Sequence, residues 1–323
     1  MILTIGAFDG FHRGHARLLE RARALSESLE TGWGAVTFYP HPGVFMKAID
    51  LTLFTLQERE LIRRVLDIPH LFIIDFDERL QSLSPEDFWR KLERTFEVSG
   101  IVVGDDFRFG RGQAGNCADL LDFCRRDGLP AETVSLLEHD GTKFSSTEIR
   151  KHVMMGEVRQ AWDVLGYPWF LWSRVTHGNR RGRTMGFPTA NIDVSGRHML
   201  PDSGVYAVAV PVDENWSCGA LSIGNNPTFG DVSELRVEVF ILDFDGDLYG
   251  RDFPVFLLDR IRPAIRFPDA EVLKEQIGRD ILLCRSIFQE ELSKTSRLFS
   301  SFLEHFQSMD AEGEFVPAIW KLV

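Results

Sequence analysis

Hydrophobic and polar residues follow two different patterns along this chain, and the pattern changes near residue 166. Up to about residue 140, short apolar runs alternate with stretches in which apolar side chains recur at helical spacing. We expect strands at 2–5, 33–39, 70–76, 100–107 and 131–137, and helices at 18–29, 55–66, 85–96 and 116–126. This alternation predicts right-handed βαβ units, a parallel sheet covered by helices, and ligands at the carboxyl ends of the strands.

After a helical connector at 153–166, the pattern changes to short alternating runs. These runs fall at 169–175, 205–212, 219–223, 235–242 and 253–258, with Gly, Pro and Asp turns between them. Short strands at regular spacing predict a small antiparallel barrel or sandwich. Residues 284–306 predict an amphipathic helix that covers it. A chain of 323 residues is longer than one typical domain, so we expect two domains, 1–166 and 167–323.

Composition argues against several classes of function. A formal net charge of −12 is unfavourable for a general nucleic-acid binder, which needs a basic face. Because the chain has no run of about 18 apolar residues and no charged-then-apolar leader, we expect no membrane span and a cytoplasmic protein. The four cysteines, Cys117, Cys124, Cys218 and Cys284, show no CxxC spacing and no clustering with histidine. That spacing argues against both a disulfide framework and a zinc site.

The stretch TIGAFDGFHRGH, residues 4–15, is built like a phosphate cradle. It follows a short apolar strand and precedes an amphipathic helix, and the backbone N–H groups at a helix start bind anions. Gly6, Gly10 and Gly14 would let a ligand approach the backbone closely. His12 and His15 are one helical turn apart, so both imidazoles can face the same phosphate. The alternative is that the glycines serve only the turn and the histidines lie on the surface.

Two later stretches of the first domain extend this picture. The segment GRGQAG at 110–115 matches GxGxxG literally, but it is separated from the preceding strand, so we do not interpret it as a dinucleotide fingerprint. With Phe107, Phe109, Arg108 and Arg111 it is better suited to stacking a planar ligand and holding its phosphate, or it is an ordinary surface loop.

The second stretch is KFSSTEIR at 143–150. Ser145 and Glu148 have the spacing of a capping box at a helix start. Ser146, Thr147 and Arg150 would make this helix start a second anion site. Two such sites in one α/β domain predict a triphosphate ligand.

In the second domain, residues 178–193 hold the one basic cluster of an acidic chain. A solvated charged loop is the usual interpretation of such a cluster. Thr189 and Asn191 follow the arginines of this cluster, Arg180, Arg181 and Arg183, however, and offer oxygen ligands suited to Mg²⁺ and its phosphates. Glu238 lies on an otherwise largely apolar predicted strand, where a carboxylate is either at the barrel rim or a positioned base.

Together, HxGH and SSTEIR resemble the nucleotidyltransferase superfamily. With GDDFRFG, GRTMGFPTAN, SIGNNPTFG, VEVFILDFDGDLYG and IRPAIRF, residues 1 to about 285 resemble the prokaryotic bifunctional riboflavin kinase/FAD synthetases. The resemblance implies a Rossmann-like domain that adenylylates FMN with ATP, releasing pyrophosphate, and a six-stranded β-barrel with a C-terminal helix that phosphorylates riboflavin. It also implies ATP, Mg²⁺ and flavins as ligands, no nucleic-acid or membrane partner, and a monomer or weak homo-oligomer.

The resemblance assigns roles residue by residue. Catalysis would fall to His12, His15, Arg150 and Glu238. ATP would be bound by Gly6, Phe8, Asp9, Gly14, Ser146 and Thr147 in the first domain, and by Gly182, Arg183, Gly186 and Pro188 in the second. Flavin would be bound by Asp106, Phe107, Phe109, Asn116 and Arg262, and Mg²⁺ by Thr189 and Asn191.

Several positions depart from the family pattern. Ala7 replaces an Asn, Tyr39 a Glu and Glu148 an Arg, and Ser222 and Asn225 replace the Asn and Arg of the NIGxRPT turn. None of these carries an assigned chemical role. The changed turn nevertheless leaves open an FAD synthetase with an inactive barrel. Two further alternatives are a non-catalytic flavin- or nucleotide-binding module, and a cytidylyltransferase acting on another substrate, which would leave the second domain unexplained.

Overall fold

The computed structural model describes residues 1–135, 138–139, 142–176, 187–194, 199–224, 235–313 and 315–322. The chain forms two compact units, Met1–Ser146 with Glu312–Val323, and Thr147–Ala311. From Thr147 onward, helix α7 (Ser146–Met154) and helix α8 (Val158–Leu165), which the sequence places in the first domain, group with the barrel.

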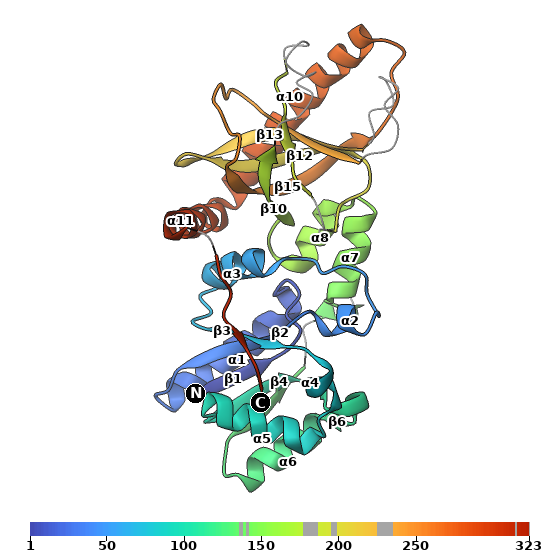
Figure 1. Cartoon of the computed structure of the whole chain (residues 1–323). Coiled ribbons are helices and arrows are strands. Elements are labelled where there is room, and N and C mark those ends of the chain that lie inside the picture. The colour runs from blue at the N-terminus through green and yellow to red at the C-terminus, as the bar shows by residue number, and fades with distance from the viewer. Residues whose placement is uncertain are drawn as a thin grey trace. The chain divides into compact units, whose positions relative to one another are not determined.

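A six-stranded parallel sheet organises the first unit (Figure 1). Its order is β16 (Ile319–Trp320), β3 (Leu71–Asp75), β2 (Trp33–Tyr39), β1 (Ile2–Ile5), β4 (Gly100–Gly104) and β7 (Ala131–Val134). The helices are α1 (Arg13–Ser28), α2 (Pro42–Phe45), α3 (Leu56–Val65), α4 (Glu78–Ser82), α5 (Pro85–Phe96) and α6 (Cys117–Arg126). The short elements are β5 (Arg108–Phe109), η1 (Arg111–Gln113), β6 (Gly115–Asn116), β8 (Glu138–His139) and β9 (Thr142–Lys143). The predicted Rossmann-like α/β fold is confirmed.

The strand order reverses between β1 and β4. From β1 the chain moves outward through β2 to β3, and then returns to place β4 on the other side of β1. In open parallel sheets, ligands bind outside the carboxyl ends of the strands at such a reversal. The carboxyl end of β1 leads directly into the HxGH turn, so the fold brings the predicted phosphate cradle to this position.

A closed six-stranded antiparallel barrel organises the second unit and confirms the prediction. Its strands are β10 (Phe170–Thr176), β11 (Ala190–Ile192), β14 (Arg236–Ile241), β13 (Asn215–Gly224), β12 (Gly204–Val212) and β15 (Asp252–Pro263). Buried and less buried residues alternate along β14, with Val237, Val239 and Ile241 in the core. Strand β11 has three residues, too few for a period-2 pattern, and the sequence did not indicate it.

The C-terminal helical region corrects one prediction. Instead of one helix over 284–306, α10 (Ala270–Lys294) ends at Thr295 and α11 (Ser296–Glu312) begins anew. The Thr295 N–H and hydroxyl both donate to the Glu291 carbonyl, at 2.9 and 2.7 Å, and so close α10. On α11, Phe299, Phe302 and Phe306 are all buried and keep helical spacing. The hydrophobic pattern therefore gave no sign of the break.

Candidate functional site

The HxGH turn has an unusual backbone. Phe8 has φ 42° and Phe11 has φ 41°, values in the left-handed region that bulky residues rarely adopt, and Gly10 between them has φ 106°. The two phenylalanine rings stack with centroids 5.0 Å apart and are both buried. Outliers of this kind persist where the surrounding structure holds them, and they cluster at binding sites. Packing of Phe8 and Phe11 therefore fixes the turn.

The two histidines of the turn lie together. His12 precedes the first residue of α1, and its ring stacks on that of His15 with centroids 3.8 Å apart. The Gly14 backbone has no room for a side chain, because a Cβ there would lie 2.9 Å from His12 Nδ1 and 2.9 Å from the Phe144 carbonyl oxygen. Gly14 thus has a packing role beside the predicted one in nucleotide binding. The two rings are thus adjacent, and their shared role at a phosphate stays a prediction.

His15 is electrostatically distinctive. Its Nδ1 atom is buried and makes no hydrogen bond to any residue that the structure describes. Burial, reinforced by the neighbouring His12, lowers the pKa of His15 well below its ordinary value of 6.5. The ring is therefore neutral near pH 7 and has one N–H for a ligand, and an anion bound there would favour the protonated form.

The sequence analysis did not identify Arg59, whose buried side chain contacts Asp9 of this turn. Arg59, on α3, and Asp9, in the turn, are both buried, and Arg59 Nη2 lies 3.3 Å from Asp9 Oδ1. The Leu53 N–H donates to both Asp9 carboxylate oxygens at 3.0 Å. Asp9, predicted to bind ATP, thus directs its side chain into the protein. The sequence signal was an arginine at position 59 beside the buried residues of α3, Leu61 and Ile62, a pattern that does not distinguish a buried guanidinium from a solvated one.

Phe144 and Ser146, both in the first unit, lie against the turn. Ser146 Oγ donates to the Asp9 carbonyl at 3.0 Å, and the carbonyl of Phe144 faces Gly14. Thr147 and Arg150 belong to the second compact unit, so their roles at the phosphate remain predictions.

The predicted flavin residues of the first unit surround the β5–β6 hairpin. Phe107 stacks on Phe109 with centroids 5.4 Å apart, and Phe109 is buried against Phe88. Asp106 is exposed beside them. The Asn116 side-chain oxygen caps α6 by accepting from the N–H groups of Ala118 and Asp119 at 2.8 and 3.3 Å. Phe107 is thus the ring of the pair with the more accessible surface.

A row of polar side chains crosses the barrel strands at Glu238. Asn191 on β11 and Ser222 on β13 are the register partners of Glu238 on β14, so their side chains share one face. Thr189 Oγ1 donates to Glu238 Oε2 at 3.0 Å. Val237 and Val239 point into the core, so Glu238 lies on the opposite, outer face of its strand. Hydroxyl, amide and carboxylate oxygens gathered in this way suit Mg²⁺, which prefers oxygen ligands.

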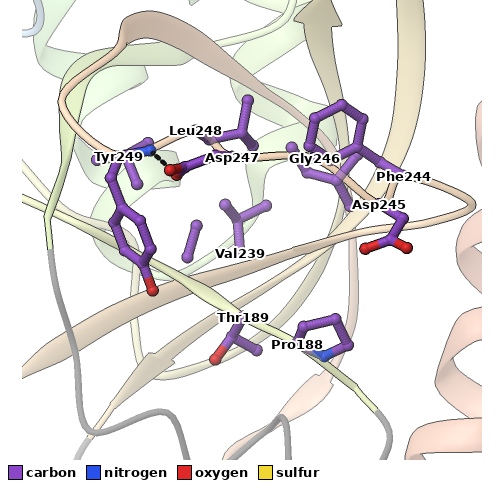
Figure 2. A pocket seen from close by; sticks show the side chains of 12 residues that line it. Pro188, Thr189, Val239, Phe244, Asp245, Gly246, Asp247, Leu248 and Tyr249 are labelled. Atoms are coloured by element: carbon purple, nitrogen blue, oxygen red, sulfur yellow. Dashed lines mark hydrogen bonds between the residues drawn. The ribbon is translucent and has the colours of Figure 1, made fainter.

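Thr189 also lines a cavity of about 490 Å³, whose wall includes Val239 on the face of β14 opposite to Glu238, and Figure 2 shows residues 244–249 facing Pro188 and Thr189 across it. Its lining joins apolar side chains such as Val239 to the carboxylates of Asp245 and Asp247. Asp247 accepts a hydrogen bond from the Tyr249 N–H at 2.9 Å, which fixes the turn above the cavity. The cavity combines an apolar wall with polar groups, as ligand pockets do.

Of the remaining predicted barrel residues, Arg262 lies within the described part of the chain. Arg262 Nε donates to the buried carboxylate of Asp280 at 2.9 Å, and its guanidinium lies 5.3 Å from the centre of the Phe267 ring. Asp280 also accepts from Gln276 Nε2 at 2.8 Å. Gly182, Arg183 and Gly186, predicted to bind ATP, and Asn225 lie outside the described residues.

Other reactive groups offer no second site within the described part of the chain. The four cysteines are free, and burial raises the pKa of Cys124, Cys218 and Cys284 to about 12, so these three thiols are unreactive near pH 7. Over the ranges given above, no three His, Cys, Asp or Glu side chains gather as a metal site. No helix among the residues searched is both long and apolar enough to cross a membrane.

The fold and sites define a nucleotidyltransferase-type α/β unit followed by a flavokinase-type barrel. The FAD synthetase family profile matches residues 1–148, and the riboflavin kinase profile matches residues 165–288. The chain belongs to the bifunctional riboflavin kinase/FMN adenylyltransferase family. It is 33% identical to the Listeria monocytogenes bifunctional riboflavin kinase/FMN adenylyltransferase over 291 residues, which cover 89% of this chain and 92% of that protein. The Escherichia coli K12 protein of the same name is 34% identical over the same shares.

A solved structure supports the fold across both units. A crystal structure described as a macrolide-efflux protein from Streptococcus pneumoniae superposes with a TM-score of 0.80 at 32% sequence identity. The match covers 88% of this chain and 93% of that one. The order of an α/β unit followed by a barrel is therefore shared with an experimentally determined structure.

Proposed function

We propose that this protein carries out both activities: its barrel phosphorylates riboflavin to FMN with ATP, and its α/β unit adenylylates FMN to FAD with release of pyrophosphate. The observation that carries the adenylylation of FMN is the stacked His12–His15 pair, which a constrained turn holds at the strand-order reversal. The observation that supports the phosphorylation of riboflavin is the hydrogen bond from Thr189, which lines a cavity, to Glu238.

In the adenylyl step, an FMN phosphate oxygen attacks the α-phosphorus of ATP, the bond to the β-phosphate bridging oxygen breaks, and pyrophosphate leaves. The N–H groups at the start of α1 and the His12 and His15 rings would stabilise the negative charge that builds on the phosphates. Arg59 and Asp9 keep the turn in place. Positioning and electrostatics suffice, and no covalent enzyme intermediate is needed.

In the kinase step, Glu238 would accept the proton of the terminal ribityl hydroxyl, or orient that hydroxyl, as the hydroxyl oxygen attacks the γ-phosphorus of ATP. The bond between the γ-phosphorus and the β–γ bridging oxygen breaks, and ADP leaves. Thr189 is placed to hold the Glu238 carboxylate in one orientation. Thr189 and Asn191 would also hold Mg²⁺, which when bound neutralises phosphate charge. Pro188 and the cavity would receive the nucleotide, and Arg262, fixed by Asp280, would contact the flavin.

A chromatographic time course of riboflavin, FMN and FAD tests this proposal, using the protein with ATP and Mg²⁺ and a parallel reaction started from FMN. We expect transient FMN followed by FAD from riboflavin, and FAD alone from FMN. Formation of neither FMN nor FAD in an otherwise folded protein would overturn the proposal.

One observation favours a second candidate, an FAD synthetase with an inactive barrel. Ser222, which departs from the family pattern, is the direct register partner of Glu238. The same time course separates the two candidates, because the inactive barrel predicts FAD from FMN with riboflavin unchanged.

A further inference from the structure

The C-terminal part of the chain lies beyond both family matches, which end at residues 148 and 288. It contains α11, the strand β16 and the connection between them. Helix α11 is anchored to the barrel unit by a hydrogen bond and by ring packing. Trp216 Nε1 donates to the Phe299 carbonyl at 2.9 Å, and the centre of the Phe302 ring lies 4.9 Å from that of Phe256. The residues after α11 group with the first unit instead.

Strand β16 completes the edge of the parallel sheet. Ile319 and Trp320 pair with Ile73 and Ile74 of β3, in parallel, and Figure 1 shows the red C-terminal strand beside β3. Without β16, β3 would be the edge of the sheet, with unpaired backbone groups. The last strand of the sheet therefore comes from the opposite end of the chain.

Side chains reinforce this pairing. The Trp320 ring packs against Phe96 and Phe72, with centroids 5.6 and 6.2 Å apart, and Leu322 packs against the core of the unit. Lys321 Nζ lies 3.6 Å from an Asp75 carboxylate oxygen. An aromatic side chain, a strand pair and an ion pair thus hold the same segment.

A charged contact fixes the segment where it leaves α11. Arg64 donates two hydrogen bonds to the Glu312 carboxylate, at 2.8 and 2.7 Å. Hydrogen bonding to Glu312, together with Glu60, raises the pKa of Arg64. This bidentate geometry is the specific form of an arginine–carboxylate contact.

We propose that the β3 edge, with Phe72 and Phe96, is a strand-docking site whose occupant is the chain's own C-terminal segment, 312–322, and that the first unit depends on this occupant for its stability. The mode is strand addition, in which main-chain hydrogen bonds give affinity and a side-chain pocket gives specificity. The pairing is two residues long and Trp320 remains 43% exposed, so the docked segment depends on the few side-chain contacts named above.

Hydrogen exchange measured by mass spectrometry tests the docking without reference to either activity. In the full chain, Trp320→Ala should raise the exchange rate of the β3 peptide, 71–75, by about tenfold, and barrel peptides should exchange as in the wild type. Val316→Ala is the matched control, because Val316 is in the same segment and 80% exposed. We expect it to leave β3 unchanged.

A second variant ends the chain after Glu312. It should expose the β3 edge fully, and addition of a synthetic peptide of residues 313–323 should restore slow exchange in 71–75. Self-association of the truncated chain that the peptide reverses would equally support docking, since an uncovered edge pairs with other copies. Unchanged exchange of β3 in both variants would overturn the proposal.

Discussion

The guanidinium of Arg59 lies 3.3 Å from the carboxylate of Asp9, and both side chains are buried beneath the HxGH turn. Two substitutions of Arg59 distinguish the contribution of its positive charge from that of its side-chain packing. Arg59→Met removes the cation that faces a buried carboxylate, and such a loss costs about 3 kcal/mol or more. Arg59→Lys keeps the charge and should recover part of the stability.

We expect Arg59→Met to lower the free energy of unfolding of the first unit by about 3 kcal/mol and to slow FAD formation from FMN, with FMN formation from riboflavin unchanged. Urea unfolding and the two rates, measured on the same preparation, check this. Equal loss of both activities would contradict the assignment of Arg59 to the adenylylation site.

The lowered pKa of His15 makes a prediction about pH. At a pH below 6.5, the ordinary pKa of histidine, His15 is protonated in the unfolded chain but still neutral in the folded protein. The contribution of the neutral His15 to the free energy of unfolding is therefore fully present above pH 6.5, and it is lost as the pH falls from there towards the pKa of the folded state. The urea midpoint should fall more between pH 7.5 and 5.5 in the wild type than in His15→Gln. Parallel loss in both proteins would show that His15 is not responsible.

Gly14 provides a steric test of the histidine pair. In Gly14→Ala the new methyl group would meet the His12 ring and a backbone carbonyl at 2.9 Å, so the His12 ring must shift. A displacement of this size should slow FAD formation from FMN at least about tenfold. Gly32→Ala is the control, because nothing lies within 4 Å of its added Cβ, and it should retain full activity. If Gly14→Ala behaves like Gly32→Ala, the position of His12 is not critical.

Asp280 is predicted to act on the flavin through Arg262. Asp280→Asn keeps the size of the side chain but removes the charge that holds the guanidinium. We expect the KM for riboflavin to rise several-fold with little change in kcat, and the rate of FAD formation from FMN to stay constant. Steady-state kinetics with each flavin check this, and an unchanged KM would argue that Arg262 does not contact riboflavin.

The sequence was most informative where local patterns agree with tertiary structure. Strand β2 and helix α5 begin and end where their patterns predict, because apolar runs and the Ser84–Pro85 helix start act locally. The HxGH turn was found in the same way, as a glycine-rich junction between a strand and a helix.

Other features arise from contacts between distant residues. Arg59 meets Asp9 across 50 positions, and the pairing of Trp320 with β3 spans most of the chain. A two-residue strand carries no periodic signal, and the break at Thr295 falls within a continuous amphipathic pattern. These features depend on contacts between residues far apart in the chain, so no local sequence pattern predicts them.

The most direct test of the account, that each unit holds one catalytic site, compares two variants in the same time course. His15→Ala should abolish FAD formation from FMN and spare FMN formation from riboflavin, whereas Glu238→Gln should do the reverse. Circular dichroism of both variants confirms folding. If either substitution disables both steps in a folded protein, the assignment of one reaction to each unit is wrong.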